Sequence, residues 1–365
     1  MNNNEKVSAM SGKERIMAVL EGRKADRVSW APLIDPYFTT SLPEQNLPEM
    51  DEIDALRYIG ADIILRHVPT YLEVFDDTVK WIDSEHDGTQ RRTASTPVGD
   101  ISIEHKRNGK TLFETKHFVE TIEDLRVMKY VLEHMSYKEN FDAFLPVAER
   151  IGDDGIATVS VPLTPLQKLL QFDAGIANFT YLFFDYEDEV RDFLDVAHKK
   201  NLEAYRLVAS APEHIKVAIS YEDTSTTVMS PAWFEEFCVD HLNEYADILH
   251  GGNKIFIAHM CGKLTGMLDS LKKCRFDGID SVCPPTTGDL EAIDALSALP
   301  GKFIIGGIEP PALQRMSVDE TYAYAKKVLD ACSAESGRLI LCTGDATPYA
   351  TPVENLKVIA ELVKE

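Results

Sequence analysis

Residues 254–282 read KIFIAHMCGKLTGMLDSLKKCRFDGIDSV, and this stretch decides the fold. It opens with an apolar segment, Lys254–His259, continues through a helical segment, Leu264–Lys273, and ends with a second apolar segment, Gly278–Val282. The two apolar segments show little alternation with polar residues, which is typical of parallel strands that are covered on both faces. A strand, a helix and another strand in this order predict one unit of a parallel α/β fold.

The same alternation of short apolar runs and longer helical stretches extends along the whole chain. Six more strands are expected at Val28–Ile34, Asp62–Arg66, Ile156–Val161, Ile215–Tyr221, Lys302–Gly306 and Arg338–Cys342. Further helices are expected at Gly12–Glu21, Asp51–Tyr58, Glu187–Ala209, Pro231–His250, Asp289–Leu296, Val318–Cys332 and Val353–Val363. Eight strands with helical connections predict a single (β/α)8 TIM-barrel domain over residues 1–365, with the first helix at the bottom of the barrel.

One region, residues 68–117, breaks this pattern after the second strand. Two or three antiparallel strands are expected there, at Thr78–Asp83, Ile101–Lys106 and Thr111–Lys116, with an Asn-Gly hairpin signal at Asn108. The insertion lies on the catalytic side of the barrel, where it forms either a lid or docking surface, or a ribbon that covers the barrel edge. A helical stretch, Ile122–Ile151, is expected to lead back into the third strand.

The composition excludes several classes of partner. The 365 residues carry a formal net charge of −23, which argues against nucleic acid and against an anionic membrane surface, because both require a basic face. No apolar run approaches the roughly 20 residues that span a bilayer. Six cysteines are too sparse for a disulfide framework, so we expect a cytoplasmic protein whose cysteines are reduced thiols or metal ligands.

In a barrel, side chains at the carboxyl ends of the strands face the reaction site. His259 and Cys261 follow the fifth strand two residues apart, so both can point to the same side of an extended chain. Imidazole nitrogen and thiolate sulfur together suit zinc. The strand-end positions are Asp35, Arg66, His67, Pro162, Glu222, Asp223, His259, Cys261, Cys283, Glu309, Cys342 and Asp345.

The remaining metal ligands stay open at this point. Cys342 ends the eighth strand and can supply a second thiolate, with Cys283 as its rival. Three protein ligands with an open position would match catalytic zinc, and Glu222 can fill the fourth position until substrate arrives. The alternative is a buried histidine with packed thiols, since cysteine is a comfortable core residue.

The order of the motifs resembles the uroporphyrinogen decarboxylase superfamily, in particular its cobalamin-dependent methyltransferase branch. The similarity covers nearly the whole chain. The segments that carry it are Lys13-Glu14-Arg15, Leu20-Glu21-Gly22, Asp26-Arg27-Val28, Tyr221-Glu222-Asp223 with Ser230-Pro231, His259-Met260-Cys261-Gly262, Gly307-Ile308-Glu309-Pro310 and Thr351-Pro352-Val353-Glu354-Asn355.

The resemblance implies zinc held by a His-x-Cys pair and a later cysteine. His259 and Cys261 match the pair, whereas Cys342 is displaced by a residue or two from the later position, and Asp345 can take its place. The decarboxylases of the superfamily carry an arginine-rich segment near the first strand that gathers the substrate's carboxylates. The matching segment here, residues 31–37, has no arginine, which places decarboxylation below methyl transfer.

The resemblance also implies cobalamin, delivered by a partner corrinoid protein, and a small-molecule methyl donor or acceptor. Because the third cysteine is displaced, the sequence favours demethylation of a donor such as an aryl methyl ether; methylation of a thiol such as coenzyme M is the alternative. Glu222 and Asp35 are the predicted catalytic carboxylates. Tyr37 and Phe38, with Tyr71 and Phe75 of the insertion, are expected to form an apolar rim for the corrin, unless they are packing residues.

Overall fold

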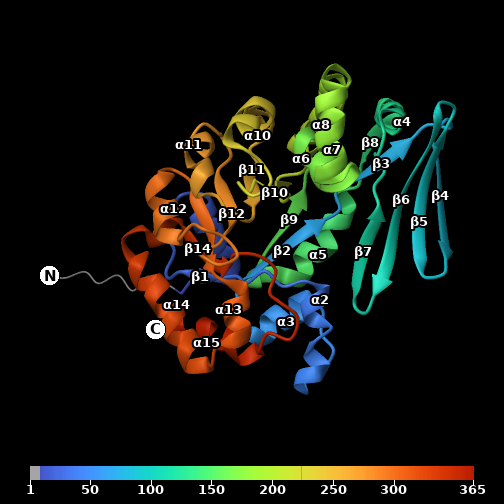
Figure 1. Ribbon diagram of the computed structural model, residues 1–365. Helices are drawn as coiled ribbons and strands as arrows, with labels where there is room; N and C mark the ends of the chain where they lie inside the picture. The colour runs from blue at the N-terminus through green and yellow to red at the C-terminus, as the bar shows by residue number, and fades with distance from the viewer. Residues whose placement is uncertain (1–8, 223) are drawn as a thin grey trace.

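The computed structural model describes residues 9–222 and 224–365. Within them, eight parallel strands form one curled, TIM-like sheet in the order β1-β14-β13-β12-β11-β10-β9-β2 (Figure 1). Each strand overlaps one of the predicted strands, so the predicted architecture is confirmed. The strands are β1 Ser29–Trp30, β2 Ile63–Val68, β9 Gly155–Ser160, β10 Val217–Glu222, β11 Ile255–Met260, β12 Gly278–Val282, β13 Phe303–Ile308 and β14 Leu339–Thr343.

Helices connect successive strands of the curled sheet and cover its outer face. The sheet closes where the backbone N–H of Asp62, just before β2, donates to the carbonyl of Trp30 in β1 over 2.8 Å. No helix of the described residues is both long enough and apolar enough to cross a bilayer. The α-helices are α1 Gly12–Leu20, α2 Pro36–Thr39, α3 Glu52–Ile59, α4 Ile122–Glu133, α5 Phe144–Ile151, α6 Pro165–Lys168, α7 Gly175–Asp185, α8 Glu187–Ala209, α9 Pro231–Phe234, α10 Asp240–Gly251, α11 Leu268–Leu271, α12 Ala292–Ala298, α13 Pro310–Arg315, α14 Val318–Ala331 and α15 Val353–Leu362.

The core has two layers because successive residues of each strand point to opposite faces of the sheet. Along β10, Val217 and Ile219 point into the barrel, and Ala218 points outward against the helices. The helix α1 contributes Ile16 and Val19 to the inner layer, as expected for a helix at the barrel bottom. This alternation decides which strand-end residues reach the mouth of the barrel.

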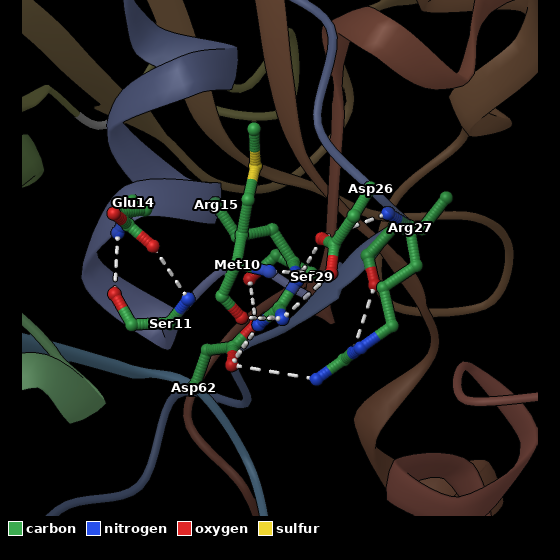
Figure 2. Close-up of polar contacts among 9 residues, drawn as sticks. Met10, Ser11, Glu14, Arg15, Asp26, Arg27, Ser29 and Asp62 are labelled. Carbon is green, nitrogen blue, oxygen red and sulfur yellow. Dashed lines mark hydrogen bonds and ion pairs between the residues drawn. The ribbon is translucent and has the colours of Figure 1, made fainter. Parts of the chain in front are cut away.

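A polar network fixes α1 to the bottom of the barrel (Figure 2). Arg15 is 4% exposed, and its guanidinium lies 2.6 Å from Asp62 and 2.8 Å from Asp26. The same group donates to the carbonyl of Met10 over 2.6 Å, and Ser29 donates to the second oxygen of Asp62 over 2.7 Å. Helix α1, β1 and β2 are therefore joined by buried charge-assisted hydrogen bonds.

The insertion after β2 is larger than the sequence predicted. It forms a four-stranded antiparallel sheet that stands beyond the curled sheet in Figure 1, and a separate two-stranded ribbon, β3–β8. The prediction missed β3 and β5, and the expected continuous helix over residues 122–151 is interrupted by β8. The Asn-Gly hairpin is confirmed, because Asn108 pairs with Thr111. The strands are β3 Tyr71–Phe75, β4 Lys80–His86, β5 Thr89–Thr96, β6 Gly99–Asn108, β7 Thr111–Lys116 and β8 Met135–Glu139.

Candidate active site at the mouth of the barrel

Three side chains from three strands meet inside the barrel near its carboxyl end. His259 of β11 places Nδ1 2.8 Å from Oδ2 of Asp280 in β12. Arg66 of β2 approaches the same carboxylate in a bidentate manner, with both N···O distances at 3.1 Å. All three residues are buried, with 7%, 1% and 7% exposure respectively. Segments far apart in the sequence thus form a hydrogen-bonded Arg66–Asp280–His259 network.

Two irregularities in the strands aim these side chains. The pairing of β2 with β9 shifts between Leu65 and Val68, and His67 has a φ of 68°. A bulge of this kind turns consecutive side chains to one face, so both Arg66 and His67 reach the mouth. The pairing of β12 with β13 shifts in the same way next to Asp280.

The electrostatics of the Arg66–Asp280–His259 network decide which ring nitrogen of His259 carries the proton. Burial alone would raise the pKa of Asp280, but the charge of Arg66 and the contact with His259 hold it well below its usual range. The ionised carboxylate can only accept hydrogen bonds, so Nδ1 of His259 carries the proton. The other ring nitrogen, Nε2, has no hydrogen-bond partner among the described residues. A carboxylate that orients an imidazole in this way is the usual support of a metal-binding histidine.

Tyr221 of β10 lies between two histidines at the same level. Its ring is 4.8 Å from that of His259 and stacks on His67 at 4.5 Å, and His67 in turn lies 3.1 Å from the hydroxyl of Ser160. Burial raises the pKa of Tyr221. Burial and the nearby positive charge of Arg66 lower the pKa of His67. The Tyr221 hydroxyl is buried and has no partner in the described part of the chain.

The family model for uroporphyrinogen decarboxylase (URO-D) matches residues 114–365, which is more than half of the sequence. The chain belongs to the uroporphyrinogen decarboxylase family. The resemblance carried by the sequence motifs is therefore confirmed at the level of the family.

The chain is also similar to two curated methyltransferases and to one solved methyltransferase structure. It is 25% identical over 228 residues to methylcobamide:CoM methyltransferase MtaA of Methanosarcina barkeri strain Fusaro / DSM 804, and 24% identical over 222 residues to MtaA of Methanosarcina barkeri. Each match covers 60% of this chain, and the chain spans 60% of the length of the curated relatives it matches. The structure of a methyltransferase from Methanosarcina mazei is 18% identical, with a TM-score of 0.62, covering 97% of this chain and 98% of that one, and supports the fold.

Two of the predicted metal ligands follow one another at the end of β11. His259 presents Nε2, and Cys261, two residues on, is half-buried just beyond β11. Among the described residues, no group of three histidine, cysteine or acidic side chains is gathered in a way that could hold a metal. The imidazole and the thiol fit zinc by their chemistry and by the support of Asp280, whereas the third predicted ligand is not brought to them.

The other predicted ligands lie elsewhere at the mouth. Cys342 points into the barrel but is wholly buried, and Arg66 donates to its sulfur over 3.9 Å. Burial raises the pKa of the Cys342 thiol to about 12. Cys283 is buried against Gly344, and the half-buried Asp345 accepts a hydrogen bond from the backbone of Ala346.

The structure does not bring Glu222 to the predicted site. Its neighbour Tyr221 points into the barrel, so Glu222 points outward, where it accepts hydrogen bonds from the backbone and the hydroxyl of Thr164 at 2.9 and 2.7 Å. Burial in this helical layer raises the pKa of Glu222 to about 7. The prediction that Glu222 fills a position on the metal is contradicted by this orientation. The strand-end residue Asp223 lies outside the described residues.

The residues near the first strand also differ from expectation. Asp35 caps helix α2, where its carboxylate accepts from the backbone N–H of Phe38 over 2.9 Å. Phe38 is fully buried in the core, so its predicted place on an apolar rim is wrong. Tyr37 is 44% exposed and lies against Tyr349, with ring centres 5.0 Å apart, and it stays a candidate for the rim.

Sequence reasoning missed Asp280 and Tyr221. Asp280 stands in the middle of an otherwise apolar strand, GIDSV, and a buried acid in such a strand is itself a signal that a cation or a histidine lies opposite. The prediction chose Glu222 and not its neighbour Tyr221, although a tyrosine hydroxyl near a strand end can equally face the mouth of the barrel.

Proposed function

We propose that this protein is a methylcobamide-dependent methyltransferase whose reaction site lies at His259 and Cys261. The observation that carries the proposal is the buried network Arg66–Asp280–His259, which holds Nδ1 of His259 and leaves Nε2 without a described partner, two residues before Cys261. The names of the curated relatives, both methylcobamide:CoM methyltransferases, support the same reaction class. The chemistry of His259 and Cys261 and the names of the relatives therefore both support methyl transfer.

We assign Nε2 of His259 and the sulfur of Cys261 as ligands of a zinc ion. When bound, zinc acts as a Lewis acid that lowers the pKa of a substrate thiol or takes up charge on a leaving oxygen. Asp280 holds the imidazole in the required tautomer, and Arg66 holds Asp280 in place from the opposite side. Burial of this chain keeps water away from Asp280, so its orientation is not lost to competing hydrogen bonds.

The methyl acceptor we propose is a small thiol. The methyl group passes from methylcobamide, carried by a corrinoid protein, to the sulfur: the Co–C bond breaks, an S–C bond forms, the corrinoid is left as cob(I)amide, and the thiol proton leaves to solvent. Both curated relatives use a thiol acceptor by name, which supports this direction. The exposed Tyr37 beside the mouth is a candidate contact for the corrinoid partner.

Demethylation of a donor such as an aryl methyl ether is the second candidate. It is favoured by the position of Cys342, whose sulfur is engaged by Arg66, so the site departs from a histidine with two cysteines. Decarboxylation ranks below both, because residues 31–37 offer no arginine for a polycarboxylate substrate.

The test combines metal content with turnover. We expect about one zinc per chain, and consumption of methylcobalamin with a thiol such as coenzyme M. Cys261→Ser should lose both zinc and activity, whereas Cys274→Ser, at a buried core thiol that donates to the carbonyl of Ser270, should keep both. Formation of methylcobalamin from cob(I)alamin and methoxyaromatics, without thiol turnover, would reverse the direction. If the purified protein contained no zinc, the proposed zinc-dependent methyl transfer would be wrong.

A further inference from the structure

A cavity of about 520 Å³ lies between the insertion and the outer wall of the barrel. The ribbon β3–β8 forms one side, helices α4 and α8 form another, and the loop after β9 forms the floor. The cavity is separate from the His259 site, which opens inside the barrel. Its aromatic lining consists of Tyr71, Phe75, Trp81, Phe118, Tyr137 and Phe193.

The ribbon directs one face into this cavity. Tyr71, Glu73 and Phe75 alternate along β3 and line the cavity, and Tyr137 lies opposite Glu73 on β8. The intervening residues Leu72 and Val74 point outward and are 49% and 41% exposed. The ribbon therefore places aromatic side chains on the wall of the cavity, where their rings also contact one another, and leaves Leu72 and Val74 in solvent.

Several polar groups of the lining have no partner. The indole N–H of Trp81 is buried and makes no hydrogen bond within residues 9–222 and 224–365. The hydroxyls of Tyr71 and Tyr137 also make no hydrogen bond with the described residues, but unlike the Trp81 indole they are not fully enclosed. Burial, with the added charge of Glu73, raises the pKa of both tyrosines, so both remain O–H donors. Unpaired donors next to a hollow are the groups that a ligand satisfies.

The charged groups of the lining decide between ligand classes. The basic side chains are already engaged: Lys168 pairs with Asp173 at 2.5 Å, Lys200 donates to the carbonyl of Met135 over 2.8 Å, and Arg92 lies 4.7 Å above the Trp81 ring. Glu73, in contrast, makes no ion pair with any described residue. An aromatic carboxylate would meet an unpaired negative charge without a spare cation. A neutral ring that both donates and accepts suits the lining better.

We propose that this cavity binds a small phenol. The ring lies among the aromatic side chains, the phenolic O–H donates to Glu73, and the phenolic oxygen accepts from a tyrosine hydroxyl of the ribbon. Glu73 is solvent-exposed, so the cavity reaches the surface at the point where the hydroxyl would be held. The inference does not depend on methyl transfer, because the lining shares no residue with the His259 site.

The test is isothermal titration of the full chain with 4-methylphenol, 4-methylanisole and toluene. We expect 4-methylphenol to bind about tenfold more tightly than 4-methylanisole, which cannot donate to Glu73, and toluene to bind more weakly still. Equal binding of 4-methylphenol and toluene, or no binding of 4-methylphenol at millimolar concentration, would overturn the proposal.

Variants on the two faces of the ribbon locate the ligand. Tyr137→Phe removes one hydrogen bond to the ligand, and Glu73→Gln replaces a charged acceptor with a weaker neutral one. Each should weaken 4-methylphenol binding by about five- to tenfold. Val74→Ala, on the outward face of the same strand, should leave the affinity unchanged. Circular dichroism and the melting temperature verify that each variant is folded. An equal loss in Val74→Ala, or no loss in the other two, would place the phenol elsewhere and defeat the proposal.

Discussion

The two ends of the barrel carry similar buried charge networks with different outcomes. At the bottom, Arg15 has an acceptor for each nitrogen, and Asp62 receives donors on both oxygens. At the mouth, Arg66 and Asp280 are equally well paired, yet Nε2 of His259 has no partner among the described residues. A completed network stabilises the fold, whereas an incomplete one retains capacity to bind. Both networks are anchored by β2 and by Asp62 just before it.

The largest effect is expected at the bottom of the barrel. Asp62→Asn removes the charge that faces Arg15 and Arg27, and leaves buried positive charge only partly compensated. We expect the free energy of unfolding to fall by about 3 to 5 kcal/mol, measured by urea denaturation. Methyl transfer per folded molecule should be unchanged. A loss of activity with intact stability would mean that the two ends do not have separate roles.

The second prediction compares the two faces of β10. The pKa of Glu222 is raised by burial to about 7 from an ordinary value of 4.5, so the folded state favours the protonated acid. Its contribution to stability is fully present below about pH 4.5 and is lost as the pH rises through about 7. Glu222→Gln mimics the protonated form, and its stability advantage should grow between these values, to about 3 kcal/mol at most.

The measurement for Glu222→Gln is urea denaturation of both proteins at about pH 5 and at about pH 8, together with turnover. The variant should retain activity, because Glu222 faces Thr164 and the helices. Abolished activity with normal stability would restore Glu222 to the catalytic role that its motif suggested. A stability difference that does not change with pH would contradict the raised pKa.

The strands were predictable because their residues carry the signal locally. Short apolar runs such as Lys254–His259 favour strands that are buried on both faces, and each of the eight predicted runs overlaps a strand of the curled sheet. The segment Met135–Glu139 was mistaken for helix because it is polar and continues the helical spacing of α4. Its strand conformation depends on pairing with β3, whose residues lie sixty or more positions earlier, and the local sequence pattern does not indicate that partner.

The site was predictable in part for the same reason. The position of His259 at the barrel mouth follows from its place at the end of β11, whereas its convergence with Cys261 stays a prediction from their spacing. The role of Asp280 depends on Arg66, 214 residues away in the sequence, and on bulges in β2 and β12 that no propensity reveals. Glu222 was misjudged by one residue, because a shift of one position along a strand exchanges the inner face for the outer face.

The third prediction makes the same aspartate-to-asparagine change at the mouth of the barrel, at Asp280. Asp280→Asn should lower zinc affinity and kcat/KM by about 10- to 100-fold, since the imidazole loses its ionised orienting partner. Asp62→Asn is the matched control, with the same chemical change at the opposite end of the barrel. Competition with a chromogenic chelator measures the affinity. Equal zinc affinity in the two variants would show that His259 does not depend on Asp280.

The smallest effect is expected from Tyr221→Phe, which removes a buried hydroxyl that has no partner among the described residues. Deleting an unsatisfied polar group costs no hydrogen bond, so the free energy of unfolding should stay within about 1 kcal/mol or rise. If the hydroxyl donates to a bound substrate beside His259, kcat/KM should fall by about fivefold while zinc content is unchanged. A stable, zinc-loaded and fully active variant would reduce Tyr221 to a spacer between His67 and His259.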